Sequence, residues 1–228
     1  MRTLVITGAG RGIGLEWSKR ALQGGDRVLC VSRTLTPELT GLVREFEGRA
    51  EALQADVSTD EGAKKIAAHP FLKGHAVDIL VNNAGVLHAE NGLEDVNFAR
   101  VEESLRINAI GPMRVTRALL AHLQKSQLPI VASVTSLMGS IADNRGGGYY
   151  SYRMSKAALN MFNKSFSVDE PGIIAIVLHP GWVQTRMGGS GATVTAADSV
   201  SGMMKVVSGL KASDTGRFFN YTGKELPW

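Results

Sequence analysis

The chain has 228 residues, of which 44% are hydrophobic and 20% charged, with a formal net charge of +4. This length suffices for one well-buried α/β core and is short for two, so we expect a single domain over residues 1–228. The basic residues are scattered without a run of five or more, and no apolar stretch approaches the ~20 residues that span a bilayer. The composition therefore argues against nucleic-acid and membrane partners.

Cysteine and histidine usage narrows the class further. Cys30 is the only cysteine, which excludes an internal disulfide and fits a reducing, cytoplasmic compartment. The five histidines show no ligand-like pairing, so we expect no metal site. An apolar run at Leu4–Ile6 leads directly into a glycine-rich turn and leaves no room for a signal peptide.

Short apolar runs, typical of buried strands, alternate along the chain with longer amphipathic segments, typical of helices. We expect strands at Thr3–Thr7, Arg27–Val31, Glu51–Ala55, Val77–Asn82, Pro129–Val134, Ile173–Leu178 and Arg217–Tyr221. We expect helices at Ile13–Gln23, from an N-cap at Thr36 to Phe46, after a capping box at Ser58–Glu61, and at Asn97–Gln124, Tyr150–Val168 and Ala197–Gly209. A kink is expected at Gly111-Pro112. This alternation predicts a Rossmann-like, doubly wound, mostly parallel seven-stranded sheet with helices on both faces.

A glycine-rich turn, TGAGRGIG, follows the first expected strand at Thr7–Gly14. Gly8 allows a tight exit from the strand, while Gly12 and Gly14 keep side chains away from a ligand and from the packed helix. The N–H groups of the helix that begins at Ile13 would face a diphosphate. The turn therefore predicts a dinucleotide site.

The end of the second strand indicates which dinucleotide binds. Folds that bind NAD place an Asp or Glu there for the ribose hydroxyls, whereas this chain has Ser32 and Arg33. A guanidinium can make a forked contact with a 2′-phosphate, and Arg11 in the glycine turn is a second candidate for that phosphate. Either arginine alone could equally be a solvated surface charge. Together with the missing acid, they favour NADPH over NADH.

Two further strand ends carry candidate cofactor contacts. Asp56 and Val57 follow the third strand, where the carboxylate could accept the adenine amino group or simply begin a turn. Asn83, Ala84 and Gly85 end the fourth strand, where they could pack against the adenine ribose at the sheet's carboxyl edge.

The chemistry is expected at Tyr152 and Lys156, which lie four residues apart and share a helix face. Of the neighbouring tyrosines, Tyr149 meets Arg153 at that spacing, and only Tyr152 meets a lysine. An ammonium at ~6 Å in an effective dielectric of ~20 interacts with a phenolate by about 3 kcal/mol. That energy would lower a phenol pKa from about 10 toward about 8, where it can both give and take a proton.

Ser136 is the expected third member of this group. Ser133, Ser136 and Ser140 all lie near the end of the fifth strand, and Gly139 would let the chain turn away and leave the Ser136 hydroxyl in the cleft. The hydroxyl would then hydrogen-bond a substrate oxygen. The chain has no Gly-x-Ser-x-Gly elbow, which disfavours a serine hydrolase.

In this order, the motifs resemble those of the short-chain dehydrogenase/reductase family. The matching pieces are Thr7–Gly14, Asn82–Gly85, Asn108, Ser136, Tyr152 with Lys156, and Pro180-Gly181 followed by Val183 and Thr185. Within the family the chain is similar to the sniffer-type carbonyl reductases and C-factor-like proteins. This finer similarity is carried by Ser140-Ile141, Tyr152–Asn160, Pro180–Thr185, Met187–Gly189 and Leu226–Trp228.

The resemblance implies a role for each residue of the site. Tyr152 would be the general acid/base, Lys156 would hold the nicotinamide ribose, and Ser136 would position the carbonyl. Asn108 would anchor a water that links Lys156 to solvent, or would satisfy helix bonds broken at the kink. Segment 180–185, through Val183 and Thr185, would fix the carboxamide of the nicotinamide.

Two departures from the family pattern concern the substrate. Ser136 lies sixteen residues before Tyr152, with Gly146–Gly148 in the longer connection, and the segment Met187–Asp198 is short. We therefore expect an open site and an NADPH-dependent reductase of aldehydes, ketones and quinones. The alternative is a nucleotide-binding signalling protein with little turnover.

The Tyr152 helix also carries more apolar surface than one buried face needs. Its later apolar residues are Leu159, Met161, Phe162 and Phe166. They favour either a homo-oligomer, dimer or tetramer, or a position in the core.

Overall fold

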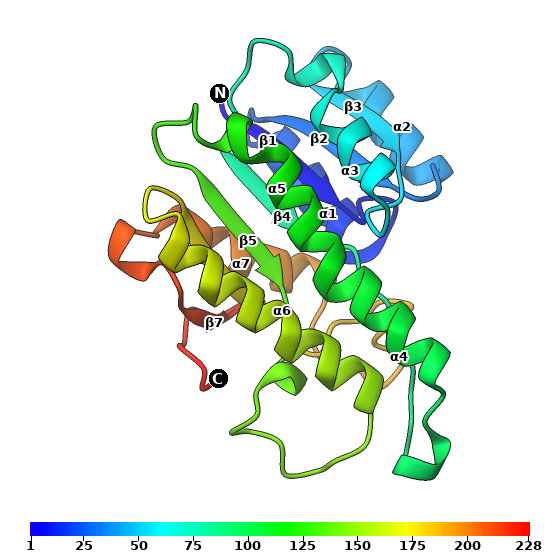
Figure 1. Ribbon diagram of the computed structural model, residues 1–228. Coiled ribbons are helices and arrows are strands. Elements are labelled where there is room, and N and C mark those ends of the chain that lie inside the picture. Colours follow the sequence, from blue (N-terminus) through cyan, green and yellow to red (C-terminus); the bar gives the residue numbers. More distant parts are fainter.

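A computed structural model describes residues 1–228, and its centre is a single seven-stranded sheet with the order β3-β2-β1-β4-β5-β6-β7 (Figure 1). All neighbouring strands are parallel. The strands are β1 Thr3–Thr7, β2 Arg27–Ser32, β3 Ala50–Gln54, β4 Ile79–Asn82, β5 Ile130–Val134, β6 Ile174–His179 and β7 Phe218–Asn220. The predicted seven-stranded, doubly wound Rossmann-like fold is confirmed, and the sheet is wholly parallel.

Helices cover both faces of the sheet (Figure 1). The α-helices are α1 Gly12–Gln23, α2 Pro37–Glu45, α3 Asp60–Ala67, α4 Phe98–Leu105, α5 Gly111–Leu123, α6 Tyr150–Asp169 and α7 Ala196–Ser208. A π-helical segment spans Arg106–Ile110, and short 3-10 turns lie at Pro70–Leu72, Leu93–Asp95, Leu137–Gly139 and Ala212–Asp214. None of the helices combines the length and the apolar character needed to cross a membrane.

The sheet separates two hydrophobic cores. One contains 24 buried residues and includes Trp17 from α1, together with side chains from α2 and α7. The other contains 17 buried residues and is formed with α3 and α5, as at Ile66 and Leu119. Successive residues of β1 alternate between them, with Leu4 in the first core and Val5 in the second. Because both faces are buried, the strands read as continuous apolar runs.

The start of α3 differs by one residue from the expected capping box. Thr59, not Ser58, is the N-cap, and its hydroxyl oxygen accepts a hydrogen bond from Gly62 N–H at 3.0 Å. Ser58 is used otherwise, because its N–H donates to the Asp56 carboxylate at 2.8 Å. The turn that begins at Asp56 therefore displaces the cap by one position.

The expected long helix over 97–124 is present as three joined segments. Asn97 caps α4 by accepting from the N–H groups of Ala99 and Arg100. The irregularity is the π-helical segment 106–110, which precedes Gly111-Pro112, so the predicted position of the kink is wrong by about one turn. Pro112 lacks the amide that an α-helix would donate to the Asn108 carbonyl, and the widened turn takes up this break before α5 begins.

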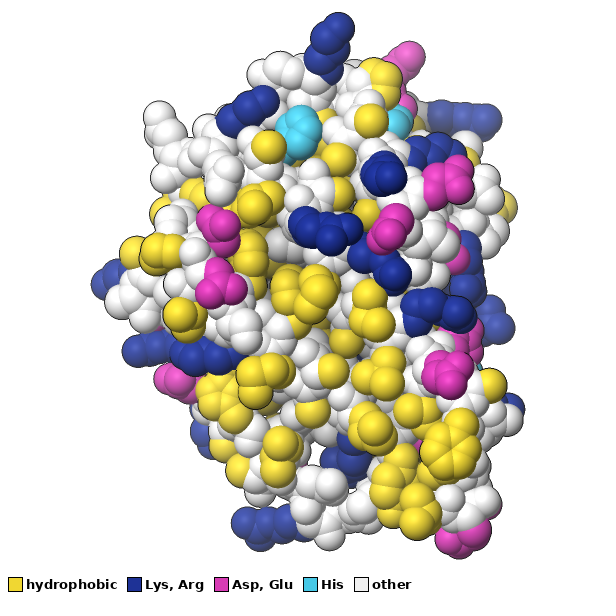
Figure 2. Space-filling model, viewed as in Figure 1, with side chains coloured by type: hydrophobic (Ala, Val, Ile, Leu, Met, Phe, Trp, Pro, Cys, Tyr) yellow, Lys and Arg dark blue, Asp and Glu magenta, His cyan; other side chains and the backbone are white.

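One face of the molecule exposes large apolar side chains. They belong to α4, the π-helical segment, α5 and α6, and hydrophobic atoms gather over these helices in Figure 2. The residues are Phe98, Ile110, Met113, Met154, Met161 and Val168, each between 42% and 76% exposed.

Candidate active site

A cleft of about 840 Å³ opens along the carboxyl edge of the sheet. It lies where β1 is flanked by β2 on one side and β4 on the other, the point at which the winding of the sheet reverses. This volume falls in the range of small-molecule and cofactor sites. The predicted residues that line it are Gly8, Arg11, Gly12, Ile13, Ser32, Arg33, Asp56, Val57, Asn83, Ala84, Gly85, Tyr152, Lys156, Pro180 and Thr185.

The glycine turn forms one wall of this cleft. Gly8 and Gly12 have φ angles of +68° and +57°, which L side chains rarely adopt. A Cβ at Gly8 would lie 2.8 Å from Ala84 Cα, and one at buried Gly14 would overlap the carbonyl oxygen of Gly8. The Asn83 side chain fastens the turn by donating to the carbonyls of residues 7 and 8. Gly14 therefore allows the close approach of α1 to the Gly8 carbonyl but does not line the cleft.

The first turn of α1 leaves backbone donors available. Its N-cap is Arg11, which makes no side-chain hydrogen bond to the helix, and the first turn holds no acidic residue. The N-terminal amides of a helix need acceptors, and the positive end of its dipole favours an anion. A cradle without side chains, open to the cleft and rich in N–H donors, fits a diphosphate.

Arg11 and Arg33 both line the cleft with exposed side chains. Neither takes part in any ion pair of the protein. Ser32, between β2 and Arg33, donates its hydroxyl to the Thr34 carbonyl at 2.8 Å. The end of β2 therefore carries an unpaired cation, Arg33, where a site that selects the ribose hydroxyls would carry a carboxylate, and Arg11 adds a second unpaired cation from the glycine turn.

Asp56 begins a turn, one of the two roles considered for it, and its place in the cleft leaves the adenine contact as a prediction. Burial opposes its ionisation, but hydrogen bonds from Ser58 and the charges of Arg33 and Arg106 outweigh that effect, so the Asp56 pKa lies below its usual value. One carboxylate oxygen starts the turn into α3 by accepting from Ser58 N–H. Asp56 also lines the cleft, beside Val57.

Tyr152 and Lys156 lie on one face of α6, only 7% and 4% exposed, with Lys156 Nζ 5.7 Å from the centre of the Tyr152 ring. Nζ donates a hydrogen bond to the Val134 carbonyl at 2.8 Å. Burial lowers the pKa of Lys156 to about 8. Burial also raises the pKa of Tyr152 to about 12, against the opposing effect of a hydrogen bond with Ser136.

The expectation that Lys156 lowers the Tyr152 pKa toward about 8 is therefore wrong for this structure. Removal of the phenol from water disfavours the phenolate more than its neighbours favour it. Near neutral pH, Tyr152 carries its proton and Lys156 its charge. The pair is thus poised as a proton donor beside a cation.

None of the three candidate serines is among the residues that line the cleft, so the Ser136 hydroxyl is not found there as expected. Among the three, the hydrogen bond with Tyr152 favours Ser136. Ser133 is completely buried and its hydroxyl has no partner, while the Ser140 hydroxyl oxygen accepts from Asp143 N–H. The Ser136 hydroxyl oxygen accepts from the N–H of Met138 at 3.1 Å, which leaves its hydrogen available to donate.

Gly139 brings the turn after Ser136 against α6. A Cβ at Gly139 would lie 2.9 Å from the Cβ of Lys156. Glycine is therefore needed here for close contact with α6 as well as for the turn.

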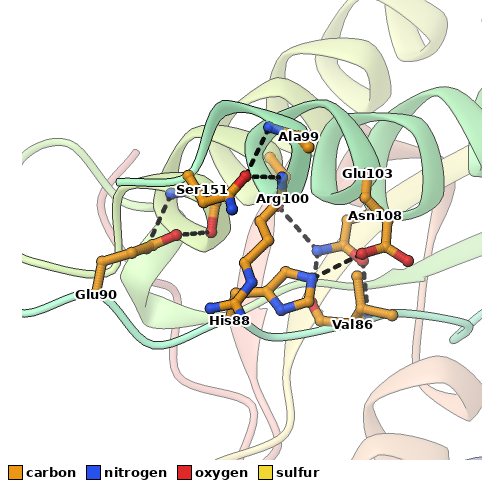
Figure 3. Close-up of polar contacts among 10 residues, drawn as sticks. Val86, His88, Glu90, Ala99, Arg100, Glu103, Asn108 and Ser151 are labelled. Carbon is orange, nitrogen blue, oxygen red and sulfur yellow. Dashed lines mark hydrogen bonds and ion pairs between the residues drawn. The ribbon is translucent and has the colours of Figure 1, made fainter. Parts of the chain in front are cut away.

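Asn108 is fully buried and does not line the cleft, and its side chain makes three hydrogen bonds (Figure 3). Oδ1 accepts from Val86 N–H at 2.8 Å, and Nδ2 donates to the Val86 carbonyl at 2.8 Å and to Ser155 Oγ at 2.9 Å. These partners lie outside its own helix, so the alternative that its side chain repairs broken helix bonds is wrong. Asn108 instead fastens the segment after β4 to α6.

The segment after β6 folds back against the glycine turn. Thr185 Oγ1 accepts from Gly188 N–H at 3.2 Å, and Thr185 Cγ2 lies 3.3 Å from where a Cβ on Gly12 would be. Val183 is buried, and Gly181, with φ +83°, packs closely on the Tyr221 ring, so neither lines the cleft. No helix intervenes between β6 and α7, in keeping with the expected short substrate-covering segment.

Several cleft residues were not anticipated. They are Gly10, Val31, Thr34, Thr36, Ala55, Val86, Ile107, Val134, Thr135, Gln184, Arg186 and Met187. Thr36 could have been found, because it lies in a polar run directly after β2, and its hydroxyl donates to the Gly10 carbonyl at 2.7 Å. Gln184 and Met187 belong to segments named for the resemblance but were given no contact with a ligand. Arg186 carries no local signal, since its place depends on how the segment after β6 folds back.

Comparisons with known proteins agree with this geometry. A family model described as short chain dehydrogenase matches residues 2–195. The protein named C-signal from Myxococcus xanthus is 53% identical over 154 residues, which cover 67% of this chain and 93% of that protein. The crystal structure of an NADPH-bound carbonyl reductase from chicken fatty liver superposes with a TM-score of 0.93 and 32% identity, covering 100% of this chain and 99% of the other. The carbonyl reductase Sniffer of D. melanogaster superposes with a TM-score of 0.93 and 30% identity over the full length of both chains.

Proposed function

The chain belongs to the short-chain dehydrogenase family, and from this premise we propose that it reduces carbonyl compounds to alcohols with NADPH. The observation that carries the proposal is the buried, protonated Tyr152 at one end of the cleft, beside Ser136 and the charged Lys156. A proton donor held out of water and next to a cation suits a reaction in which a carbonyl oxygen gains a proton.

NADPH is the cofactor that the residues of the cleft fit. The amides of the glycine turn would hold the diphosphate, and Arg33 with Arg11 would hold the 2′-phosphate. Asp56 would meet the adenine, and Asn83–Gly85 its ribose. The NADPH bound to the chicken liver enzyme supports this assignment. When bound, the reduced nicotinamide supplies the hydride.

The chain's own residues would supply the proton and the orientation. Tyr152 would donate its phenolic proton to the substrate oxygen while the carbonyl carbon gains the hydride, so that an alcohol and a phenolate result. Ser136 would donate a second hydrogen bond to the same oxygen. The Lys156 ammonium would stabilise the phenolate, which burial otherwise disfavours.

We propose aldehydes, ketones and quinones as the substrate class. No helix covers the cleft between β6 and α7, and two side chains of that segment, Trp182 and Met187, are 56% and 46% exposed. Met187 lines the same cleft as Tyr152. An open and partly apolar entrance would admit varied carbonyl compounds and bind each weakly.

A second candidate function is nucleotide-dependent signalling with little turnover. The observation that favours it is the 53% identity with the protein named C-signal. The intact set of Ser136, Tyr152 and Lys156 favours the reductase.

The test is NADPH oxidation with a panel of quinones, diketones and aldehydes, with the alcohol product identified by mass spectrometry. The reductase predicts turnover of at least one class, with NADPH preferred to NADH. Tight NADPH binding without turnover on any member would favour the signalling function instead.

We also propose that the apolar face over α4, α5 and α6 joins copies of the chain. Of the residues that suggested an oligomer, Leu159 is buried and Phe166 packs against the second core, whereas Met161 is 67% exposed. Together with the other apolar side chains on this face, it offers a patch of the kind that marks interfaces (Figure 2). Light scattering of the wild type and of Met161→Glu tests this, since an unchanged mass in the variant would place the interface elsewhere.

A further inference from the structure

The entry into α6 is conformationally demanding. Gly147, Gly148 and Tyr149 have successive left-handed φ angles of +63°, +60° and +49°, and Tyr149 is the only non-glycine residue of the chain with a positive φ. Such a conformation costs a non-glycine residue about 1–2 kcal/mol, so surrounding contacts must hold it. Tyr149 is the N-cap of α6 but makes no side-chain hydrogen bond to it. Tyr152 follows in the first turn, so its position depends on whatever does hold this entry.

Glu90, which is distant in the sequence, stabilises the entry into α6 through hydrogen bonds (Figure 3). Its carboxylate is 1% exposed and accepts from Ser151 Oγ at 2.6 Å and from Ser151 N–H at 3.3 Å. Its backbone carbonyl accepts from Tyr149 N–H at 2.7 Å. Gly148 lies so close that a Cβ there would be 2.9 Å from the same carbonyl oxygen. Glu90 therefore contacts three of the four residues at the helix entry, namely Gly148, Tyr149 and Ser151.

The N-terminus of α6, and no cationic side chain, stabilises the Glu90 carboxylate. Glu90 forms no ion pair with any lysine, arginine or histidine. A buried carboxylate is costly unless hydrogen bonds and dipoles satisfy it, and the N-terminus of a helix offers both. Glu90 thus replaces, from outside α6, the cap that Tyr149 does not provide.

Glu90 also belongs to the segment that forms a wall of the cleft. That segment begins with Gly85 and Val86, which line the cleft, and Asn108 fastens it to the π-helical turn through Val86. Contacts from Asn108 to Ser155 and from Glu90 to Ser151 connect the same wall to α6 on either side of Tyr152.

We propose that Glu90 is a positioning residue for proton transfer, which anchors the first turn of α6 so that the Tyr152 hydroxyl stays aligned with the cleft. The proposal rests on the proposed reductase function. A misplacement of about 1 Å can cost on the order of 100-fold in rate when reacting groups must be aligned. The anchor would therefore influence kcat far more than cofactor binding, which uses the glycine turn on the other side of the cleft.

The test compares Glu90→Ala and Glu90→Gln with Glu103→Gln as the matched control. The Glu103 carboxylate in α4 pairs with His88 at 2.9 Å, and His88 lies two residues before Glu90. The Glu103 side chain forms no hydrogen bond to the entry of α6. Glu90→Ala removes both acceptors of Ser151 and should lower kcat about 30- to 100-fold, with NADPH affinity within about twofold of wild type. Glu90→Gln keeps one acceptor oxygen and the side-chain volume, and should lower kcat by more than twofold but by less than about tenfold. Glu103→Gln should leave kcat within about twofold.

Hydrogen exchange of the amides in segment 149–155 supplies a readout that does not depend on turnover. Glu90→Ala should speed exchange there and leave the glycine turn unchanged, whereas Glu103→Gln should change neither. Should Glu90→Ala not fold, the comparison of Glu90→Gln with Glu103→Gln decides, since a positioning role requires slower turnover only in the former.

Two results would overturn the proposal. One is a folded Glu90→Ala with wild-type kcat, and the other is a parallel loss of kcat and NADPH affinity in both Glu90→Ala and Glu103→Gln. If the wild type reduces no carbonyl compound, the reductase function fails by itself. Hydrogen exchange then still decides whether Glu90 anchors α6, and unchanged exchange in Glu90→Ala would reject the anchor.

Discussion

The two ends of the cleft use charge in opposite ways. At the glycine-turn end, Arg11 and Arg33 are exposed and unpaired, and the shape of the site comes from backbone without side chains. At the other end, Tyr152 and Lys156 are buried, and burial shifts both of their pKa values. Solvent weakens the interactions of the exposed charges but leaves these side chains free to bind a ligand. The buried groups interact more strongly, but their burial lowers the stability of the folded state.

This difference indicates which end of the cleft tolerates substitution. Under the proposed function, the exposed arginines would contribute selectivity that can be altered at little cost to folding. The buried pair would contribute reactivity at the expense of stability, because Lys156 is held as a cation in a place that favours its neutral form. The predictions below test each half of this contrast.

The largest effect on NADPH binding is expected at the glycine turn, where backbone shape matters more than charge. Gly14→Ala would force a Cβ into the carbonyl oxygen of Gly8, so NADPH affinity should fall by at least about 100-fold, measured by calorimetry. The matched control is Gly41→Ala in α2, where a Cβ meets nothing within 4 Å. That variant should bind normally and gain about 0.5–1 kcal/mol of stability. Normal NADPH binding by Gly14→Ala would show that the turn does not shape the site.

Lys156→Met should have opposite effects on turnover and on the free energy of unfolding. Turnover should fall about 100-fold, because the phenolate loses its neighbouring cation. Burial lowers the Lys156 pKa from 10.5 to about 8, so the folded state disfavours the charged form and loses about 3 kcal/mol at pH 7. Removing the charge regains that energy, less about 1 kcal/mol for the hydrogen bond lost at the Val134 carbonyl.

The net gain for Lys156→Met is about 2 kcal/mol at pH 7, measured by urea unfolding. The unfolded chain binds the extra proton between about pH 8 and 10.5, so the gain should shrink through this window and give way above it to a deficit of about 1 kcal/mol from the lost hydrogen bond. A variant less stable than wild type at pH 7 would contradict the cost assigned to the buried ammonium.

The exposed end should change selectivity with little effect on folding. Arg33→Ala should weaken NADPH about 10- to 100-fold through loss of charge-assisted hydrogen bonds, and leave NADH within about twofold. Arg11→Ala should have a smaller effect of the same kind. Binding titrations with both cofactors measure this, and equal losses for NADPH and NADH would discard the assignment of the 2′-phosphate site.

The pH dependence of kcat and of NADPH affinity should also distinguish the two ends of the cleft, although the expected changes are smaller. Tyr152 stays protonated to about pH 12 and Lys156 loses its charge at about pH 8, so kcat for reduction should be flat below pH 7 and decline above pH 8. NADPH affinity should stay constant over the same range, because arginine keeps its charge. A kcat that stays level to pH 10 would contradict the role of the Lys156 ammonium.

Features with a short-range signal were predictable from the sequence. The alternation of apolar runs predicts the sheet, and the spacing of Gly8, Gly12 and Gly14 predicts the turn. The four-residue spacing likewise places Tyr152 and Lys156 on one helix face, as the structure shows.

Features that depend on three-dimensional packing were not predictable. The Tyr152 pKa was expected to fall and rises instead, because its direction depends on burial, which spacing does not reveal. Arg186 reaches the cleft only because the segment after β6 folds back, and Glu90 meets Ser151 across 61 residues of chain. Asn108 was placed at the helix irregularity, but its partners Val86 and Ser155 come from other elements.

Tyr152→Phe tests the central claim most directly, because it keeps the buried ring and removes only the hydroxyl. Turnover of the best carbonyl substrate should fall by about 10²- to 10⁴-fold, the usual worth of a general acid, while NADPH affinity stays within about twofold. Wild-type turnover in a folded Tyr152→Phe that binds NADPH normally would contradict the account, because the proton would then come from another group.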